Sequence, residues 1–197
     1  MSDLFARKIE MEYAEVFHYP EFFSKKEADN YFKNLQKNIP WQQDTIKVFG
    51  KTHLQPRLTA FFASNNLNYS YSNITMKPHH FSEKLKEIKH KIETETQHYF
   101  TSCLANLYRD GKDSNGWHAD DEKELGKNPV IASVSFGTER VFKFRKKEDH
   151  KIQHKMILEH GSLLIMKGET QHFWQHQIPK TQKKIGERIN LTFRNII

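Results

Sequence analysis

The segment Arg188-Ile-Asn-Leu-Thr-Phe-Arg194 alternates polar and apolar side chains over seven residues. Such an alternation predicts a β-strand, because successive side chains of a strand point to opposite faces of a sheet. The four polar residues would then share one face and the three apolar residues the other. If the polar face points inward, its two arginines need an anion beside them. The alternative is a polar outer face with the apolar residues in the core.

Similar short segments, apolar or alternating, fill the second half of the chain. They predict strands at 103–108, 130–136, 140–145, 155–159, 162–166, 172–176 and 188–193.

The first half predicts two helices instead. One begins at Ser24, which forms a capping-box pattern with Glu27, and ends at the Ile39-Pro40 break; the other spans about 82–99. Two helices followed by many short strands predict an α+β protein with a double-stranded β-helix, or jelly roll. The helices would cover the outer face of one of its two sheets. The mouth of such a barrel is its natural pocket.

Length and composition limit the possibilities further. A chain of 197 residues and 23.5 kDa, without repeats or low-complexity linkers, predicts a single domain. The net charge of +7 favours a polyanionic partner if the excess is clustered, although a well-solvated basic surface explains it equally well. Cys103 is the only cysteine, which excludes an intramolecular disulfide and a four-thiolate zinc site.

A possible metal-binding pair, His118-Ala-Asp120, follows the polar turn 110–116. Residues two apart in an extended segment point to the same side, so both side chains can face one ion. A distant third ligand could be His172 or His176, and their spacing does not decide between them. Two imidazoles and one carboxylate suit an open-sided iron(II) site, which leaves positions for a co-substrate and oxygen. The arginines at 188 and 194 could clamp the carboxylates of a dicarboxylic acid such as 2-oxoglutarate.

Five segments together resemble a known family. They are Asn106-Leu-Tyr-Arg-Asp-Gly111, His118-Ala-Asp-Asp-Glu122, Ala132-Ser-Val-Ser-Phe-Gly137, His160-Gly-Ser-Leu-Leu-Ile-Met166 and Arg188-Ile-Asn-Leu-Thr-Phe-Arg194. These resemble the AlkB family of iron(II)- and 2-oxoglutarate-dependent nucleic-acid dealkylases, from roughly residue 46 to the C-terminus.

The resemblance implies the ligands of the iron and of the co-substrate. It assigns iron to His118, Asp120 and His176, and His176 is chosen because it lies twelve residues before Arg188. It also assigns two groups of residues to the binding of 2-oxoglutarate. Arg194 and Asn106 would bind its C1 end, and Arg188, Asn190 and Tyr108 would bind its far carboxylate, with Thr192 beside them.

The resemblance also implies substrate contacts in a nucleotide-recognition lid. The lid residues are Val48, Phe49, Gly50, Lys51, Arg57, Tyr69 and Tyr71. Phe49 is the expected wedge that fills the gap left by a flipped base. The alternative is that Val48 and Phe49 are core residues of a hairpin that turns at Gly50.

Two acids next to the metal pair complete these expectations. Asp121 is the expected catalytic carboxylate beside a base made cationic by methylation, and Glu122 is expected at the same substrate. The alternative is that Asp121 and Glu122 are both acids of an exposed turn. The basic stretch 140–147, with Lys151 and Lys155, could contact phosphates.

By resemblance, we expect a DNA-repair dioxygenase that demethylates 1-methyladenine and 3-methylcytosine, using iron(II), 2-oxoglutarate and O2. It would release formaldehyde, succinate and CO2. RNA is the alternative substrate, and a catalytically silent binding module is the alternative class. The domain would divide into helices and lid at about 1–100 and a catalytic jelly roll at about 101–197.

The start of the chain lacks a signal peptide, and no apolar run is long enough to span a bilayer. We expect an intracellular monomer without membrane contact, cytoplasmic if bacterial and nuclear if eukaryotic.

Overall fold

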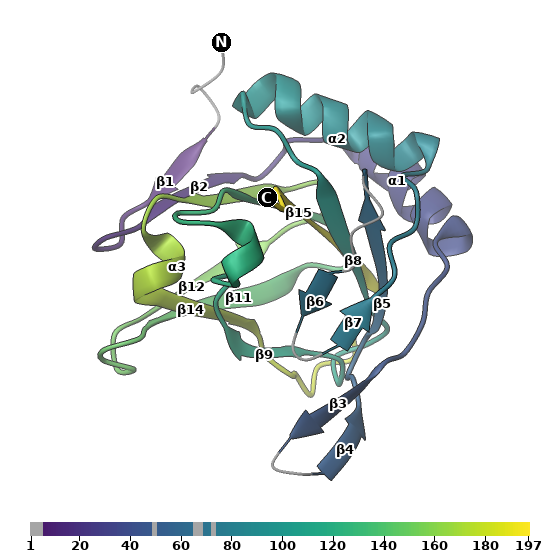
Figure 1. Cartoon of the computed structure of the whole chain (residues 1–197). Helices are drawn as coiled ribbons and strands as arrows, with labels where there is room; N and C mark the ends of the chain where they lie inside the picture. The colour runs from purple at the N-terminus through teal and green to yellow at the C-terminus, as the bar shows by residue number, and fades with distance from the viewer. Residues whose placement is uncertain (1–5, 49–50, 65–68, 72–73) are drawn as a thin grey trace.

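A computed structural model of the chain describes residues 6–48, 51–64, 69–71 and 74–197 (Figure 1). Two antiparallel sheets form its main body. The larger sheet contains, in spatial order, β1 (Arg7–Ile9), β2 (Glu15–Tyr19), β13 (Leu163–Lys167), β10 (Ile131–Gly137), β15 (Arg188–Arg194), β8 (Ser102–Tyr108) and β5 (Leu58–Ala63).

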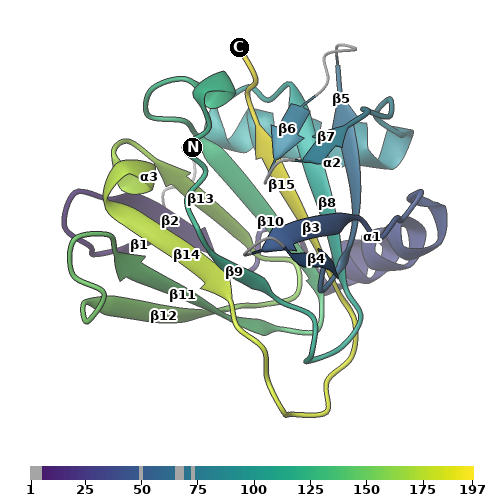
Figure 2. The same ribbon diagram turned by 60° about the horizontal axis from the view of Figure 1, so that its bottom comes forward.

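The smaller sheet contains β12 (Gln153–Leu158), β11 (Arg140–Lys146), β14 (Trp174–Ile178) and β9 (Asn115–His118). Figure 2 shows these four strands side by side, with the larger sheet behind them. The predicted double-sheet jelly roll is confirmed. Two separate hairpins, β3 (Thr45–Val48) with β4 (Lys51–Leu54) and β6 (Tyr69–Tyr71) with β7 (Ile74–Met76), carry residues of the predicted lid.

Two helices cover the larger sheet, as predicted (Figure 1). In α1 (Lys25–Asn38) the capping box is present, because the Ser24 side chain accepts from the Glu27 amide and the Glu27 side chain accepts from the Ser24 amide. Helix α2 (Glu83–Thr96) ends three residues earlier than expected, because the next residue, Gln97, has a left-handed φ of 56°. A buried apolar cluster joins the helices to the sheet and includes Leu35, Leu85, Ile88, Ile92, Val134, Phe136, Ile189, Leu191 and Phe193.

Between the two sheets lies a second buried cluster, which includes Leu104, Phe142, Phe144, Trp174 and Ile178. Strand β15 is consequently buried on both faces. Its apolar side chains pack under the helices, and its polar side chains line the space between the sheets. The alternative of a polar outer face is therefore wrong.

Parts of the sequence-based prediction differ from the structure. The strand expected at 172–176 begins only at Trp174, because a short helix, α3 (Thr170–Phe173), precedes it. The Thr170 hydroxyl donates to the Lys167 carbonyl at 2.6 Å and stabilises this turn. Strands β1, β2 and β5 join the larger sheet from the first half of the chain, where no strand was predicted. Of these, β1 has three residues, too few for a clear alternation.

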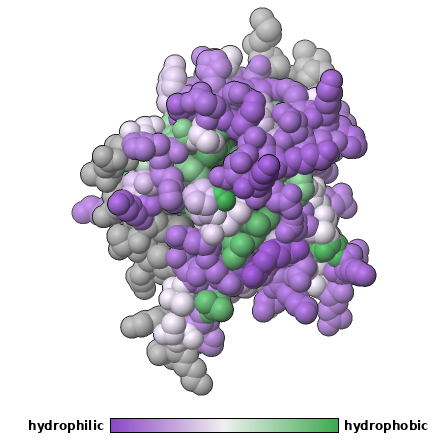
Figure 3. Space-filling model, turned by 90° about the vertical axis from the view of Figure 1, so that its right-hand side faces the viewer, coloured by the Kyte–Doolittle hydropathy of each residue, from purple (hydrophilic) through white to green (hydrophobic). Residues whose placement is uncertain are grey.

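The surface seen in Figure 3 is mostly hydrophilic, with small separate hydrophobic areas. None of the described helices has the length and apolar character needed to cross a membrane.

Candidate metal and cofactor site

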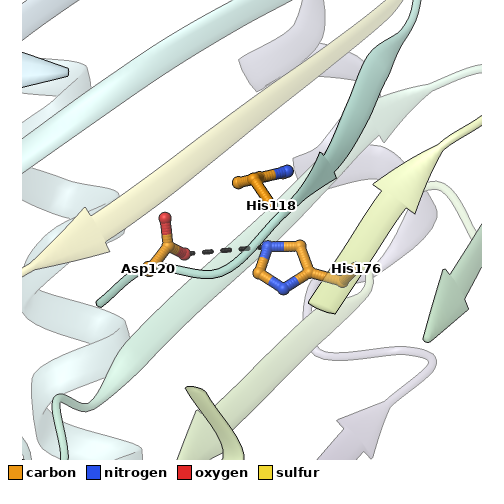
Figure 4. A group of neighbouring side chains, drawn as sticks. All are labelled: His118, Asp120 and His176. Atoms are coloured by element: carbon orange, nitrogen blue, oxygen red, sulfur yellow. Dashed lines mark ion pairs between the residues drawn. The ribbon is translucent and has the colours of Figure 1, made fainter. Parts of the chain in front are cut away.

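Two neighbouring strands of the smaller sheet bring three potential metal ligands together. His176 on β14 stands directly opposite His118, the last residue of β9, and Asp120 follows two residues later. One ligand atom from each residue lies within 4.8 Å of the others. Figure 4 shows the Asp120 carboxylate directed toward the His176 ring. This arrangement can hold a single cation. The other candidate, His172, is exposed, and its Nε2 lies 2.7 Å from Asn128 Oδ1.

The site holds its ligands in the protonation states that a divalent cation needs. Burial alone would raise the pKa of Asp120, but the Arg194 guanidinium and the two imidazoles outweigh it and lower this pKa to about 2. Burial and the neighbouring His118 lower the pKa of His176 to about 3. Arg194 Nη2 also donates to Asp120 Oδ1 at 2.6 Å, which orients the carboxylate. At neutral pH the carboxylate is thus charged and the His176 ring is neutral.

A cavity adjoins the three ligands, with about 440 Å³ of empty space that includes its opening to solvent. Its apolar wall includes Leu104, Phe142, Met166 and Ile178, and its polar wall includes Asn106, Tyr108, Ser133, Arg188, Asn190, Thr192 and Arg194.

Arg188 is a buried cation in this wall with unused donors. Its Nη2 donates to Ser135 Oγ at 2.9 Å, whereas Nε and Nη1 have no hydrogen-bond partner among the described residues. Burial lowers the pKa of Arg188 to about 10, so the group stays charged at neutral pH. The ion pairs of the described part of the chain provide no carboxylate for it. A guanidinium in this state fits a carboxylate of a small ligand.

Amide and hydroxyl groups beside Arg188 form a connected network. Asn190 stands opposite Asn106 in the ladder, and its Nδ2 donates to Ser133 Oγ at 2.8 Å. The Thr192 hydroxyl donates to Asn190 Oδ1 at 3.0 Å. All six residues expected at 2-oxoglutarate line this one cavity.

The expected substrate residues lie in different surroundings. Arg57 is buried, and its Nε donates to Asn106 Oδ1 at 2.7 Å, so the structure brings it to the cofactor wall. Asp121 is exposed, as its exposed-turn alternative describes, accepts a hydrogen bond from Lys147 Nζ at 2.7 Å and does not line the cavity. Glu122 is half-buried, and burial together with Asp120 raises its pKa. The exposed-turn alternative therefore does not describe Glu122.

The hairpins carry the remaining expected contacts. Val48 pairs with Lys51 at the ends of β3 and β4, and Tyr69 and Tyr71 belong to β6. Residues 49–50 lie outside the described residues, so the wedge at Phe49 and the turn at Gly50 stay predictions.

The basic stretch expected at phosphates is only partly exposed. Arg140 is buried, and its guanidinium donates to the carbonyls of Asp110, Asp113 and Pro179. Arg140 therefore holds loops together and is not part of the exposed basic surface. The alternation with Phe142 and Phe144 could have revealed this inward position.

Gln171 on α3 is a further residue of the site, which sequence reasoning missed. Its fully buried Oε1 accepts from the Asp120 backbone amide at 2.9 Å, across 51 residues of sequence. Gln171 thereby connects the segment before His176 to the loop that carries Asp120. No local pattern indicates such a contact.

We predict that Gln171→Leu lowers iron(II) affinity by roughly 10- to 100-fold, the range found for residues that orient metal ligands. The reason is that the Asp120 amide would lose its acceptor inside the protein, which costs about 1–3 kcal/mol unless the loop moves. Calorimetric metal titration would measure the change. Met166→Leu keeps an apolar side chain in the cavity wall and removes the weaker 3.6 Å contact between Met166 Sδ and Gln171 Nε2, so it is the control. Equal metal affinity in both variants would contradict the positioning role.

A family model described as the 2OG-Fe(II) oxygenase superfamily matches residues 15–194. The chain belongs to this superfamily. The match begins earlier than residue 46, where the sequence resemblance became visible. The oxygenase is 46% identical over 187 residues to the human alpha-ketoglutarate-dependent dioxygenase alkB homolog 3, covering 90% of this chain and 65% of that protein. The corresponding protein of Bos taurus is 47% identical over 186 residues, covering 90% of this chain and 64% of the relative.

A second group of relatives is named for activity on DNA. Human DNA oxidative demethylase ALKBH2 is 38% identical over 189 residues, covering 91% of this chain and 72% of the relative. The solved structure of OsALKBH1 has a TM-score of 0.69 at 17% identity, covers 96% of this chain and 99% of its own, and shows the shared fold. The chain spans 64% to 65% of the length of the two alkB homolog 3 proteins.

Proposed function

We propose that this oxygenase is a DNA-repair dioxygenase that demethylates 1-methyladenine and 3-methylcytosine, and that its single domain suffices for the reaction. One observation carries the proposal: the His118, Asp120 and His176 set lines one cavity together with Arg188, which has no carboxylate partner in the described part of the chain. That combination fits a metal ion and a carboxylate ligand side by side. The names of the relatives, a 2-oxoglutarate-dependent dioxygenase and a DNA demethylase, support the co-substrate and the nucleic acid.

In this proposal, His118, Asp120 and His176 hold iron(II), and Arg188, Asn190 and Tyr108 hold the far carboxylate of 2-oxoglutarate. Asn106 and Arg194 hold its C1 end, with Thr192 beside the network. When bound, iron and 2-oxoglutarate use O2 to hydroxylate the N-methyl group, which leaves as formaldehyde, with succinate and CO2 as the other products.

The residues of the chain orient and shield this chemistry. Arg194 keeps Asp120 ionised and directed toward the metal position. Leu104, Phe142 and Ile178 keep water away from the same cavity. Asp121, one residue beyond the ligand Asp120, would leave Lys147 and approach the cationic base.

In the proposal, the lid hairpins and the half-buried Glu122 bind the substrate. Arg57 belongs to the same group and also supports Asn106. The proposed cellular setting is the cytoplasm of a bacterium or the nucleus of a eukaryote, with the protein acting as a monomer.

One experiment tests the function. The protein is loaded anaerobically with iron(II) and 2-oxoglutarate, then mixed with O2 and methylated DNA or matched RNA, and succinate and the repaired base are followed. We expect both products to appear with DNA. Faster turnover of RNA would favour an RNA demethylase, and binding without succinate would favour a silent binding module.

The lid yields a separate prediction. Phe49→Ala should lower repair of methylated double-stranded DNA by roughly tenfold or more, because a few kcal/mol of unstacking would no longer be offset. Single-stranded repair should stay nearly intact, since a single strand has no opposing base to lose. Both rates and the melting temperature are measured. If Phe49 is a core residue, the variant should melt earlier and lose both activities together.

A further inference from the structure

The outer face of the smaller sheet carries cations that form no ion pair with a carboxylate in the described part of the chain. Along β11, Phe142 and Phe144 are buried, so Lys143 and Arg145 point to the other side. Lys143 stands directly opposite Lys155 on β12 and Gln177 on β14; Arg145 stands opposite Gln153 and Gln175. These six residues form two rows across three strands, and we call them the basic face.

The pairing of Lys143 with Lys155 is unfavourable for the fold. Like charges directly opposite each other in an antiparallel ladder are destabilising. Neither lysine takes part in an ion pair within the described part of the chain. No aspartate or glutamate occupies an outward position of β11, β12 or β14. An anion that binds between the two lysines would remove this repulsion.

The second row is built around Arg145. Its guanidinium lies 4.5 Å from the centre of the Trp117 ring, and its Nε donates to Gln175 Oε1 at 2.8 Å. These contacts fix the plane of the guanidinium and leave its two terminal NH2 groups for another acceptor. Arginine, lysine and glutamine side chains are common donors to phosphate oxygens.

The basic face is connected to the metal site through shared strands. His176 lies between Gln175 and Gln177 on β14, and Trp117 precedes His118 on the edge strand β9. Figure 2 shows β9 at the border of the smaller sheet. A nucleic-acid strand that leaves the cavity around this edge would therefore reach Trp117 on β9 first. It would then reach Arg145 and Lys143 on β11, and Lys155 on β12 last.

We propose that the basic face binds the phosphodiester backbone of the same nucleic-acid strand whose modified base enters the cavity. This inference rests on the proposed function for its ligand. The face adds affinity for long strands and contributes nothing to a substrate too short to pass beyond the edge of β9.

The test compares Lys143→Gln/Lys155→Gln with Lys33→Gln/Lys37→Gln, which removes the same charge from exposed positions of α1. Binding of a single-stranded DNA of about 20 nucleotides is measured over a range of salt concentrations. Loss of two phosphate contacts should reduce the slope of log affinity against log salt by about 1.4. The α1 variant should keep the wild-type slope. An unchanged slope in the basic-face variant, or an equal fall in both, would overturn the proposal.

A second variant separates binding from folding. Lys155→Glu places a carboxylate opposite Lys143, so it should raise the melting temperature while it weakens binding of the long strand. A lowered melting temperature together with unchanged binding would contradict the proposal.

Turnover of a methylated trinucleotide by the wild-type protein tests the proposed function independently. If neither the trinucleotide nor the long methylated strand is demethylated, the proposed function fails, whereas the salt slopes still decide the basic face. If turnover of the trinucleotide falls in Lys143→Gln/Lys155→Gln as much as binding of the long strand, the effect lies in the cavity and the basic face is refuted.

Discussion

Asp120→Ala is expected to abolish iron(II) binding at micromolar concentrations and to lower demethylation by roughly 10³-fold or more, because the site loses its single anionic ligand. The Arg194 guanidinium, now 2.6 Å from the carboxylate, would remain buried beside two imidazoles and repel a dication. Breaking a buried ion pair from one side costs about 3–5 kcal/mol, so the melting temperature should fall as well. Metal titration, turnover and melting are measured on the same preparation.

Two further variants separate the roles of Asp120. Asp120→Asn keeps an oxygen that can accept from Arg194, so it should recover part of the stability while metal affinity stays low. Asp121→Asn changes the neighbouring carboxylate, which is exposed and bound to Lys147, and should keep metal affinity. If Asp120→Ala retained most of its iron affinity, the assignment of the metal ligands would be wrong.

The fold was predictable where one local pattern decides the structure. Ser24 and Glu27 start α1 because their side chains satisfy each other's backbone amides within three residues. Strand β15 was predictable from alternation, and burial of both of its faces follows from the helices on one side and the cavity on the other. The start of β14 at Trp174 was not predictable, because His172 and Phe173, which belong to α3, fit a strand and a helical turn equally well.

The site was predictable only as far as residue types identify it. His118 and Asp120 are two residues apart, so their spacing alone indicates a candidate ligand pair. The selection of His176 over His172 needed the resemblance. The structure explains this selection, because His176 pairs with His118 in the ladder between β14 and β9. Gln171 and Arg57 act through contacts across 51 and 49 residues, for which the sequence contains no local signal. Such contacts become visible only when the strands are placed in register.

Arg188→Met is expected to raise the concentration of 2-oxoglutarate needed for half-maximal activity by roughly 100-fold, since a hydrogen-bonded charge pair in a buried site is worth about 2–5 kcal/mol. Without co-substrate, the same variant should melt at a higher temperature than the wild type. Without co-substrate, the protein buries a guanidinium that has no carboxylate partner among the described residues and whose Nε and Nη1 are unused donors. Methionine removes that desolvation cost at similar length. Stabilisation of the variant by 2-oxoglutarate should be lost.

Arg140→Met is the matched control for Arg188→Met, because the two guanidinium groups lie 5.6 Å and 5.2 Å from the same Tyr108 ring. Arg140 donates to three backbone carbonyls, so its loss should lower the melting temperature and leave stabilisation by 2-oxoglutarate intact. Opposite shifts of the two melting temperatures would distinguish a guanidinium kept for a ligand from one kept for the fold. If Arg188→Met melted earlier and were still stabilised by 2-oxoglutarate, Arg188 would be structural and another residue would hold the far carboxylate.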